Sequence, residues 1–341
     1  MARAGAIVLA AGLLVLGAAS ARADGVAEFY QGRTLTVLVG HEAGTGFDVY
    51  GRALARHIGR HVPGQPNVVV QNMPGAGGVT AANWLANIAP RDGLLLATIV
   101  HIALLDNQLG QGRLAKFDPN SFGWVGNVEQ SVATCGVSKA SGIQRFDELM
   151  VRETVFGGSA VGGALSLGTF ALKNLLGAKL KIAQGYKGSA DLKLAFARGE
   201  IEGICGLPIS TLKTNWRDVV ESGQFKAVIQ LNHDRHPLLA GLPHLYDFAK
   251  TDEDRQVFDL VFGSAVLGRI FLTPPEAPAA RLSALRAAFD ATMVDREFLA
   301  AADAGQLEVS SASGEVVARL IKQYTSVSTA VAERARLAIK P

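Results

Sequence analysis

Apolar runs alternate with amphipathic segments along the first third of the chain. Strand-like runs cover residues 34–40, 67–71 and 94–99 and are rich in Val, Leu and Ile. Between them, residues 48–61 and 79–89 place apolar side chains at helical spacing. The order strand, helix, strand, helix, strand predicts a parallel sheet that is covered by helices on both faces.

The same alternation starts again after an extended stretch at residues 124–138. We expect four further strands and two helices there, with Ser189 capping the second helix and Gly199 ending it. The strands are at 154–157, 181–184, 201–206 and 225–231, and the helices are at 165–176 and 190–198. This pattern indicates a second α/β unit of similar size.

From His236 onward the pattern predicts loops, then a strand at 269–272 and a helix after Pro274 and Pro275. Helices at residues 314–339 close the chain, and we expect them to pack on the first unit. The predicted domains are therefore 24–128 together with 234–341, and 129–233. A single large α/β domain is the alternative interpretation.

The first 23 residues have the pattern of a secretory signal peptide. Arg3 precedes an uncharged apolar run at residues 4–19, and Ala21 and Ala23 form a small-x-small cleavage site. The run is shorter than the roughly 20 residues that cross a bilayer. We expect cleavage after Ala23 and a periplasmic mature protein; an uncut signal anchor is the alternative.

Charge and composition exclude some partners. The net charge of the 341-residue chain is +3. Without Arg3 and Arg22 of the predicted signal peptide, 31 basic residues remain against 30 acidic ones, so the net charge is +1. Basic runs interleaved with aromatic residues are absent, which argues against nucleic acid. Cys135 and Cys205 lie in predicted strands, where they form either a disulfide or two buried thiols.

Several catalytic and cofactor motifs begin but are not completed. Gly44 and Gly46 start a dinucleotide fingerprint, yet Val49 stands at the third glycine position. Residues 157–161 lack the closing glycine of a nucleophile elbow, and residues 185–189 lack the length of a phosphate-binding loop. We therefore expect no enzymatic activity and no cofactor.

Histidines give no strong metal signal. His57 and His61 are four residues apart on a predicted helix, with His41 nearby in the sequence, but solvated side chains are the simpler interpretation. His233 and His236 flank a predicted loop and are interpreted in the same way. We expect no metal site.

Two glycine-rich loops occupy matching positions in the two units. Residues 40–46 join a strand to a helix in the first unit, and residues 157–163 do so in the second. In open α/β sheets, ligands bind at the carboxyl ends of strands, where backbone N–H groups and helix N-termini favour anions. The two loops therefore predict a ligand site, although each can also be a simple tight turn.

Three segments resemble the periplasmic receptors of tripartite tricarboxylate transporters, the Bug-type proteins. They are residues 35–48, 68–78 and 81–97, and the Asn-x-Pro-Gly-Ala-Gly-Gly motif at 72–78 is the most specific part. Residues 186–188 and 199–203 also match, so the resemblance covers nearly the whole mature chain.

The resemblance implies a type II periplasmic-binding-protein fold, in which two α/β lobes are joined by two crossing strands near Val128 and Leu231. It also implies a small carboxylate in the cleft, hinge closure of the lobes, and delivery to membrane permease subunits by a monomeric receptor. The implied ligand-binding residues are His41, Glu42, Ala43, Gly44, Thr45, Gly46, Phe47, Asp48, Thr98, Ser159, Ala160, Gly162, Gly163, Tyr186 and Gly206.

The chain departs from the family pattern in the loops that would hold the ligand. Gly40 and Glu42 replace prolines, Thr45 replaces a glycine and Phe47 replaces a threonine. Further changes are Gly163 for serine, Ser166 for histidine and Gly206 for aspartate. Glu42 either repels a second carboxylate or faces solvent, and Phe47 either stacks on a ligand ring or packs in the core. Tricarboxylates are therefore not the expected ligand.

Asp48 has a second role available, because it can cap the helix that follows, and we favour this role over ligand contact. Two other functions remain as alternatives, the first with the same fold and the second with the same candidate residues. One is a ligand-sensing ectodomain for a signalling partner. The other is a secreted hydrolase or lyase that uses His41 and Glu42 as acid and base.

Overall fold

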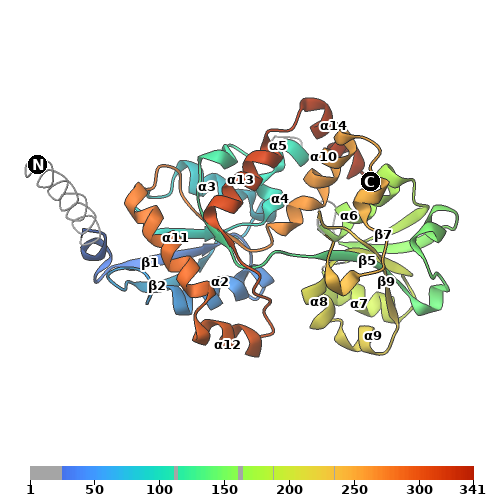
Figure 1. Ribbon diagram of the computed structural model, residues 1–341, viewed down its shortest axis with the longest axis horizontal. Helices are drawn as coiled ribbons and strands as arrows, with labels where there is room; N and C mark the ends of the chain where they lie inside the picture. Colours follow the sequence, from blue (N-terminus) through green and yellow to red (C-terminus); the bar gives the residue numbers. More distant parts are fainter. Residues whose placement is uncertain (1–24, 111–113, 160–163, 187, 234) are drawn as a thin grey trace, which may run out of the picture.

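The computed structural model describes residues 25–110, 114–159, 164–186, 188–233 and 235–341. The strands form two sheets, of six and five strands, each within its own α/β lobe (Figure 1). The predicted signal peptide lies outside the described residues. Among the helices that are described, none is long and apolar enough to cross a membrane.

The six-stranded sheet of the first lobe has the order β11-β4-β10-β3-β1-β2. β1, β2 and β3 are parallel to one another, and β10 runs antiparallel between β3 and β4. The strands are β1 (Thr34–Val39), β2 (Asn67–Asn72), β3 (Leu95–Thr98), β4 (Gly123–Asn127), β10 (Ile270–Thr273) and β11 (Ala312–Ser313). The predicted parallel sheet is thus present, with an antiparallel part added from the end of the chain.

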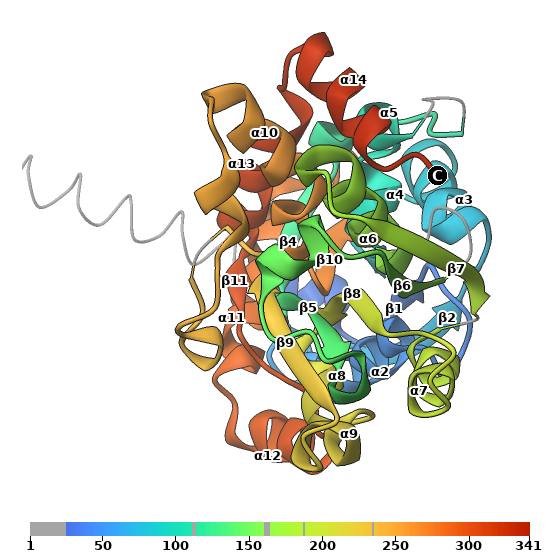
Figure 2. The same cartoon turned by 90° about the vertical axis from the view of Figure 1, so that its right-hand side faces the viewer.

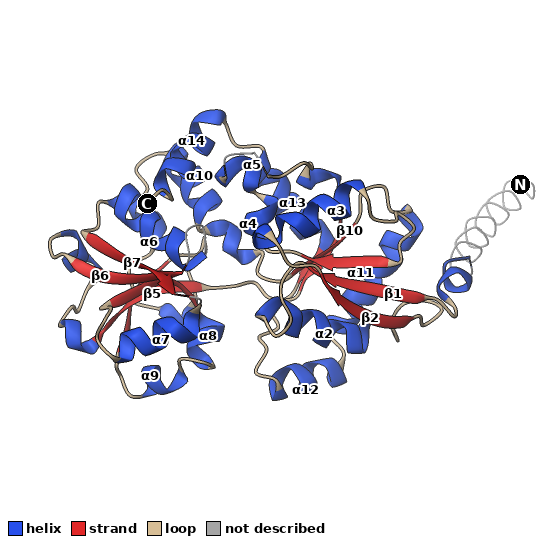
Figure 3. Ribbon diagram, turned by 180° about the vertical axis from the view of Figure 1, so that it is seen from behind, coloured by secondary structure: helices blue, strands red, loops and turns tan. Residues whose placement is uncertain are grey.

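Helices cover both faces of this sheet because its strands are apolar on both sides (Figure 3). Along β3, Leu96 packs on one face while Leu95 and Ala97 pack on the other. The Leu96 face carries α2 (Gly46–Ile58), α11 (Ala279–Met293) and α12 (Arg296–Ala304). The opposite face carries α3 (Val79–Asn87), α4 (His101–Leu104) and α13 (Gly314–Thr325).

The five-stranded sheet of the second lobe has the order β7-β6-β8-β5-β9. Its strands are β5 (Ala133–Ser138), β6 (Thr154–Ser159), β7 (Leu180–Tyr186), β8 (Gly203–Pro208) and β9 (Phe225–Gln230). α6 (Ala164–Leu176) packs on one face. The other face carries α7 (Ser189–Ala197), α8 (Ile209–Lys213) and α9 (Arg217–Glu221), around the buried Trp216.

One extended segment crosses directly from the first lobe to the second. Residues 128–132 link β4 to β5, and Val128 N–H donates to the carbonyl oxygen of Arg269 at 2.9 Å. The return from β9 to β10 is longer and carries α10 (Asp252–Val261). Its Leu245, Tyr246 and Phe258 pack in the core of the second lobe. This part of the predicted 234–341 segment therefore contacts the second lobe as well as the first.

The last helix, α14 (Thr329–Ala338), lies across the two lobes (Figure 1). Asn174 on α6 of the second lobe donates its side-chain amide to the carbonyl oxygens of Ala338 and Lys340, both at 2.9 Å. Arg336 donates to the carbonyl oxygen of Gln108 at 3.3 Å, next to α5 (Asp106–Leu109) of the first lobe. The C-terminal helix, which we expected to pack on the first unit, is thus bonded to both halves of the molecule.

Two helix starts differ from the predictions. α2 begins at Gly46 rather than at 48, because Thr45 has the extended backbone of an N-cap. α7 begins at Ser189, so that Gly188 is the N-cap residue and Ser189 makes no cap.

The predicted loop region after His236 contains α10, which starts with a capping box between Thr251 and Asp254.

Candidate ligand site

The strand directions bring the carboxyl ends of both sheets face to face. β1, β3 and β4 point the same way, because β3 and β4 are each antiparallel to β10, and β4 continues into the crossing segment. In the second lobe, β8 is antiparallel to β5, and β6 and β7 are parallel to β8. The ends of β1 and β3 therefore face the ends of β6, β7 and β8, as expected for a ligand site in this class of fold.

The crossing segment divides the space between the lobes into two unequal sides. On one side, here called the wide side, Figure 2 shows β10, β1 and β2 behind β8, β6 and β7, and β3 lies between β10 and β1. On the other, the narrow side, β11 and β9 lie on the same side of the crossing segment. The described residues that were predicted to bind ligand follow or end strands of the wide side, except Gly206, which lies within β8. Ala160, Gly162 and Gly163 lie outside the described residues.

Asp48 holds the loop that follows β1. Its carboxylate is 3% exposed and accepts hydrogen bonds from Gly44 N–H, Arg52 Nε and Asn72 Nδ2, each at 2.9 Å. The Arg52 bond is the main reason that the pKa of Asp48 falls from 3.8 to about 2. Asn72 Nδ2 also donates to the carbonyl oxygen of His41 at 3.0 Å. Asp48 is in the first turn of α2 and is not the N-cap residue, so its observed role is to order this loop.

Three side chains stack beside this loop. The rings of His41 and Phe47 are parallel, with centroids 4.4 Å apart, and the Arg269 guanidinium lies 4.6 Å from the Phe47 centroid. Phe47 is half-buried in this stack, whereas Glu42 is exposed. Burial lowers the pKa of His41, and the charge of Arg269 acts in the same direction. His41 is therefore held towards its neutral form.

Gly46 lets Arg269 approach the loop closely. A Cβ atom at position 46 would lie 3.0 Å from Arg269 Nη2. The guanidinium also lies 5.0 Å from the ring centroid of Tyr50. Arg269 comes immediately before β10, so it stands at the wide-side edge of the sheet, next to the crossing segment.

Glu129 on the crossing segment is the acidic partner of Arg269. Its side chain is 2% exposed, and its Oε2 lies 3.6 Å from Arg269 Nε. Its Oε1 accepts a hydrogen bond from Ser210 Oγ of the second lobe at 3.0 Å. A charge pair with a buried carboxylate and a partly exposed guanidinium therefore lies where the two lobes meet.

Buried polar atoms without a hydrogen-bond partner gather on the wide side. Among the described residues they include His41 Nδ1, Thr98 Oγ1, His101 Nδ1, Ser159 Oγ, Glu129 Oε2 and Arg269 Nε. Most buried polar groups in folded proteins are hydrogen-bonded. A cluster of buried polar atoms without hydrogen bonds therefore indicates a place where a ligand or water binds. Burial and the nearby Arg269 charge lower the pKa of His101 to about 4.

A small cavity of about 70 Å³ lies between the lobes. His101 and Ile102 line it from the first lobe, and Gly206 and Leu167 line it from the second. Gly206 has a backbone φ of 77°, a conformation that glycine adopts without strain. Of the predicted site residues, Gly206 lines this cavity and Thr98 ends the strand before His101.

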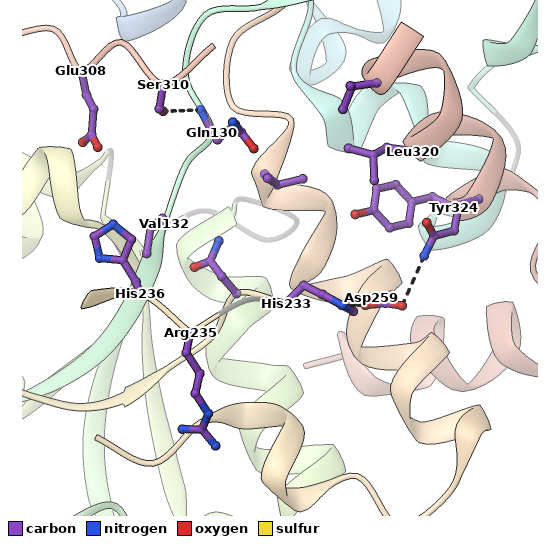
Figure 4. Close-up of a pocket in the computed structure, with 14 residues that line it drawn as sticks. Gln130, Val132, His233, Arg235, His236, Asp259, Glu308, Ser310, Leu320 and Tyr324 are labelled. Carbon is purple, nitrogen blue, oxygen red and sulfur yellow. Dashed lines mark hydrogen bonds and ion pairs between the residues drawn. The ribbon is translucent and has the colours of Figure 1, made fainter. Parts of the chain in front are cut away.

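A cavity of about 460 Å³ lies on the narrow side (Figure 4). Gln130 and Val132 of the crossing segment line it, together with His233 and His236 after β9 and Tyr324 on α13. None of the predicted ligand-binding residues that the structure describes lines this cavity. Many of its polar groups already have hydrogen-bond partners; His233 Nδ1, for example, lies 2.9 Å from Asp259 Oδ1, and Arg235 donates to Asp247.

The remaining predicted site residues lie at strand ends of the second lobe and in the loop after β1 of the first lobe. Ser159 ends β6 opposite Tyr186 at the end of β7, and Tyr186 packs partly against the core. Thr45 Oγ1 bonds the carbonyl oxygen of Glu42 at 2.8 Å. Ala43 and Gly44 are exposed in the same loop.

Cys135 and Cys205 form a disulfide, with Cα atoms 4.0 Å apart. They belong to the neighbouring strands β5 and β8, and both are fully buried. The bond therefore ties the strand that enters the second lobe to a strand that ends at the candidate site.

The histidines considered for a metal are dispersed. His57 lies 2.9 Å from Arg60 Nη2, and His61 lies 2.7 Å from Asp295 Oδ2. Within the described ranges, no group of three or more His, Cys, Asp or Glu side chains is placed to hold a metal ion.

The sequence analysis missed Arg269, Glu129 and His101. Arg269 was seen only as the first residue of a predicted strand, and Glu129 fell in a stretch interpreted as extended. The available signal was a lone charged residue at the edge of an apolar strand. Only the strand order shows that these two residues meet.

No model of a known protein family matches the chain. A curated relative, the "UPF0065 protein in gbd 5'region" of Cupriavidus necator, is 27% identical over 253 residues, which is 72% of each chain. A TctC solute-binding protein from Polaromonas is 20% identical, with a TM-score of 0.69, and covers 90% of this chain and 98% of its own.

Two further solved structures share the fold. The periplasmic binding protein BugD is 22% identical with a TM-score of 0.62, covering 89% of this chain and 97% of its own. A protein of R. palustris solved with adipate is 21% identical with a TM-score of 0.62, again covering 89% and 97%. The chain therefore has the two-lobed fold of the solute-binding proteins, and the neighbours confirm its resemblance to Bug-type receptors at the level of the fold.

Proposed function

We propose that this protein is a periplasmic solute receptor that binds a small carboxylate on the wide side, between its two lobes. The observation that carries the proposal is the cluster of unpartnered buried polar atoms at the facing strand ends, beside the Arg269 guanidinium. A ligand carboxylate would accept hydrogen bonds from the donors of this cluster and so supply the bonds that they lack. The relative solved with adipate supports this ligand class.

The proposed binding residues come from both lobes. His41, Thr45 and Thr98 contribute from the first lobe, and Ser159 with Tyr186 contributes from the second. We include Ala160, Gly162 and Gly163 in the proposal on the sequence alone, because they belong to the second glycine-rich loop. Backbone N–H groups in the two loops would provide further donors.

Ligand binding would close the lobes about the segment near Val128 and Leu231. A ligand that contacts both lobes at once stabilises the closed arrangement, which is the basis of hinge closure. We propose that 24–128 with 234–341 and 129–233 form the two moving bodies, except that the segment around α10 moves with the second lobe, in whose core Leu245, Tyr246 and Phe258 pack. We propose also that residues 1–23 direct export and that the closed form, a monomer, delivers its ligand to the permease of a tripartite tricarboxylate-type transporter.

Thermal unfolding with a panel of mono- and dicarboxylates, aromatic acids and neutral analogues tests the proposal. A carboxylate present at 100 times its Kd adds about 2.7 kcal/mol to the free energy of unfolding. The corresponding amides and alcohols should add nothing. A panel in which no carboxylate raises the melting temperature would reject the proposal, and turnover of any panel member would favour an enzyme instead.

Thr98→Val separates binding from stability. Thr98 is fully buried and its Oγ1 has no partner among the described residues, so an isosteric methyl should leave the melting temperature of the free protein unchanged or higher. Carboxylate affinity should fall about three- to tenfold, the worth of one hydrogen bond. Thr154→Val is the matched control: Thr154 is equally buried but lies at the far end of β6 and donates to the carbonyl oxygen of Arg152. This control should leave affinity unchanged.

A further inference from the structure

We propose that Arg269 and Glu129 act as a pair that selects carboxylates carrying a hydrogen-bond donor, an ammonium or a hydroxyl group, on the carbon next to the carboxylate. The inference rests on the proposed function and specifies its substrate class. It assigns the carboxylate to Arg269 and the neighbouring donor to Glu129.

Arg269 has donors to spare. Its Nη1 donates to the carbonyl oxygen of Gly268 at 2.7 Å. Its Nε has no hydrogen-bond acceptor, and Nη2 bonds to none of the described residues. The guanidinium is nevertheless held in place, because its plane lies beside the rings of Phe47 and Tyr50 and its edge contacts Gly46. An oriented guanidinium with free N–H groups suits a carboxylate, which it can bind through two parallel hydrogen bonds.

Glu129 has an acceptor to spare. Ser210 occupies Oε1, while Oε2 is buried and accepts no hydrogen bond of normal geometry. The Tyr50 hydroxyl interacts with this carboxylate, but its own hydrogen bond goes to the carbonyl oxygen of Glu308 at 3.0 Å. The 3.6 Å between Oε2 and Arg269 Nε is too long for a direct hydrogen bond. A buried carboxylate oxygen in this condition is costly unless a donor reaches it.

The free N–H groups of Arg269 and the free carboxylate oxygen of Glu129 are adjacent, and together they suit a ligand that has both an acceptor and a donor. A plain carboxylate on Arg269 would bring a second negative charge beside Glu129 and leave Oε2 without a donor. A 2-ammonium or 2-hydroxyl group is attached to the carbon that bears the carboxylate, so it can reach Oε2 while the carboxylate binds Arg269. The ammonium also balances the charge of the site, because two positive groups then face two negative ones.

Isothermal titration with two matched sets of ligands tests the pair: succinate, malate and aspartate, and propionate, lactate and alanine. Within each set we expect the donor-bearing ligands to bind at least about tenfold more tightly than the unsubstituted acid, because a hydrogen bond to a charged group is at stake. Glu129→Gln should reduce the preference for the amino acid at least about tenfold, since the charge that attracts the ammonium is lost.

Arg269→Met should weaken every carboxylate about ten- to hundredfold, and Arg269→Lys should restore part of the affinity. Because Arg269→Met leaves the Glu129 charge buried and unpaired, the neutral double variant Arg269→Met/Glu129→Gln shows whether a loss comes from poor folding. Arg145→Met is the matched control, since Arg145 is an exposed arginine paired with Asp147 in the second lobe. It should leave affinity unchanged.

The outcomes separate the two proposals. If wild-type protein binds the unsubstituted acids as tightly as their substituted partners, or if folded Arg269→Met keeps its affinity, the selectivity pair is wrong while the carboxylate receptor stands. If the wild-type protein binds no carboxylate at all, the proposed function fails and this inference fails with it.

Discussion

Replacing Asp48 by asparagine tests how the loop after β1 is held. The wild-type carboxylate accepts three hydrogen bonds while almost fully buried. Asparagine has the same shape, but its amide nitrogen cannot accept, so at least one of the three donors loses its partner. We therefore expect a less stable protein whose loop is less well ordered.

The expected loss follows from the pKa of Asp48. A fall from 3.8 to about 2 corresponds to about 2 kcal/mol of folding free energy at neutral pH, since one pKa unit is worth about 1.4 kcal/mol. Arg52 is 44% exposed, so solvent screening reduces its share, and 1–2 kcal/mol is our order-of-magnitude expectation. Because the folded-state pKa is depressed, this contribution is complete above about pH 4 and is lost as the pH falls towards about 2.

Urea denaturation of wild-type and Asp48→Asn protein, at pH 7 and in steps down to about pH 2.5, measures this contribution. The difference in unfolding free energy should be greatest at pH 7 and should shrink below about pH 4. Asp147→Asn is the control, because Asp147 is 63% exposed and should show little difference at any pH. A difference that stays constant from pH 7 to pH 3 would refute the electrostatic account of this loop.

Three further predictions concern the two lobes. Reducing the Cys135–Cys205 disulfide, which spans 70 residues, should lower the free energy of unfolding by about 4 kcal/mol on the chain-entropy estimate, measured as a lower urea midpoint. Gly126→Ala should cost about 1–3 kcal/mol, because the new Cβ would lie 2.2 Å from Cε1 of the buried Phe289; thermal unfolding measures this cost. The ring protons of His101 should not titrate between about pH 5.5 and pH 8 in NMR spectra, because its pKa is lowered to about 4 and the ring stays neutral.

Each of these has a direct check. The variant Cys135→Ala/Cys205→Ala should be insensitive to reductant, and an equal response of both proteins would contradict a role for the disulfide. Gly25→Ala has open space around its Cβ and should be neutral, so similar losses at both glycines would argue against crowding at Gly126. A His101 titration near pH 6.5 would show that its ring is not desolvated.

The sequence predicted the elements of the two sheets well, because parallel strands covered on both faces are continuous apolar runs. It was weaker where the decisive information lies in the meeting of distant segments. Arg269 and Glu129 are 140 positions apart, and nothing local to either indicates that they face one another. α10 was interpreted as loop, although its Thr251–Asp254 capping box was a readable start signal.

Most of the described residues of the predicted site end or follow strands whose ends lie between the lobes, and their contact with a ligand stays a prediction. The surroundings of Asp48 differ from those expected. Asp48 was interpreted as the cap of its helix, whereas it bonds back to the loop that precedes the helix. Phe47 was assigned either to a ligand ring or to the core; the structure adds a stack on His41, which the sequence did not indicate. Side-chain partners of this kind depend on where the chain turns, which apolar periodicity does not specify.

The position of α14 has a practical consequence for work with this protein. The carboxyl-terminal segment is hydrogen-bonded through Asn174 to the second lobe and through Arg336 to the first. Trimming residues 329–341 would remove a brace that limits how far the halves can swing apart, and solution scattering would register a larger radius. Affinity tags and fluorescent fusions placed directly after Pro341 would disturb these contacts and change the lobe motion that they were meant to report.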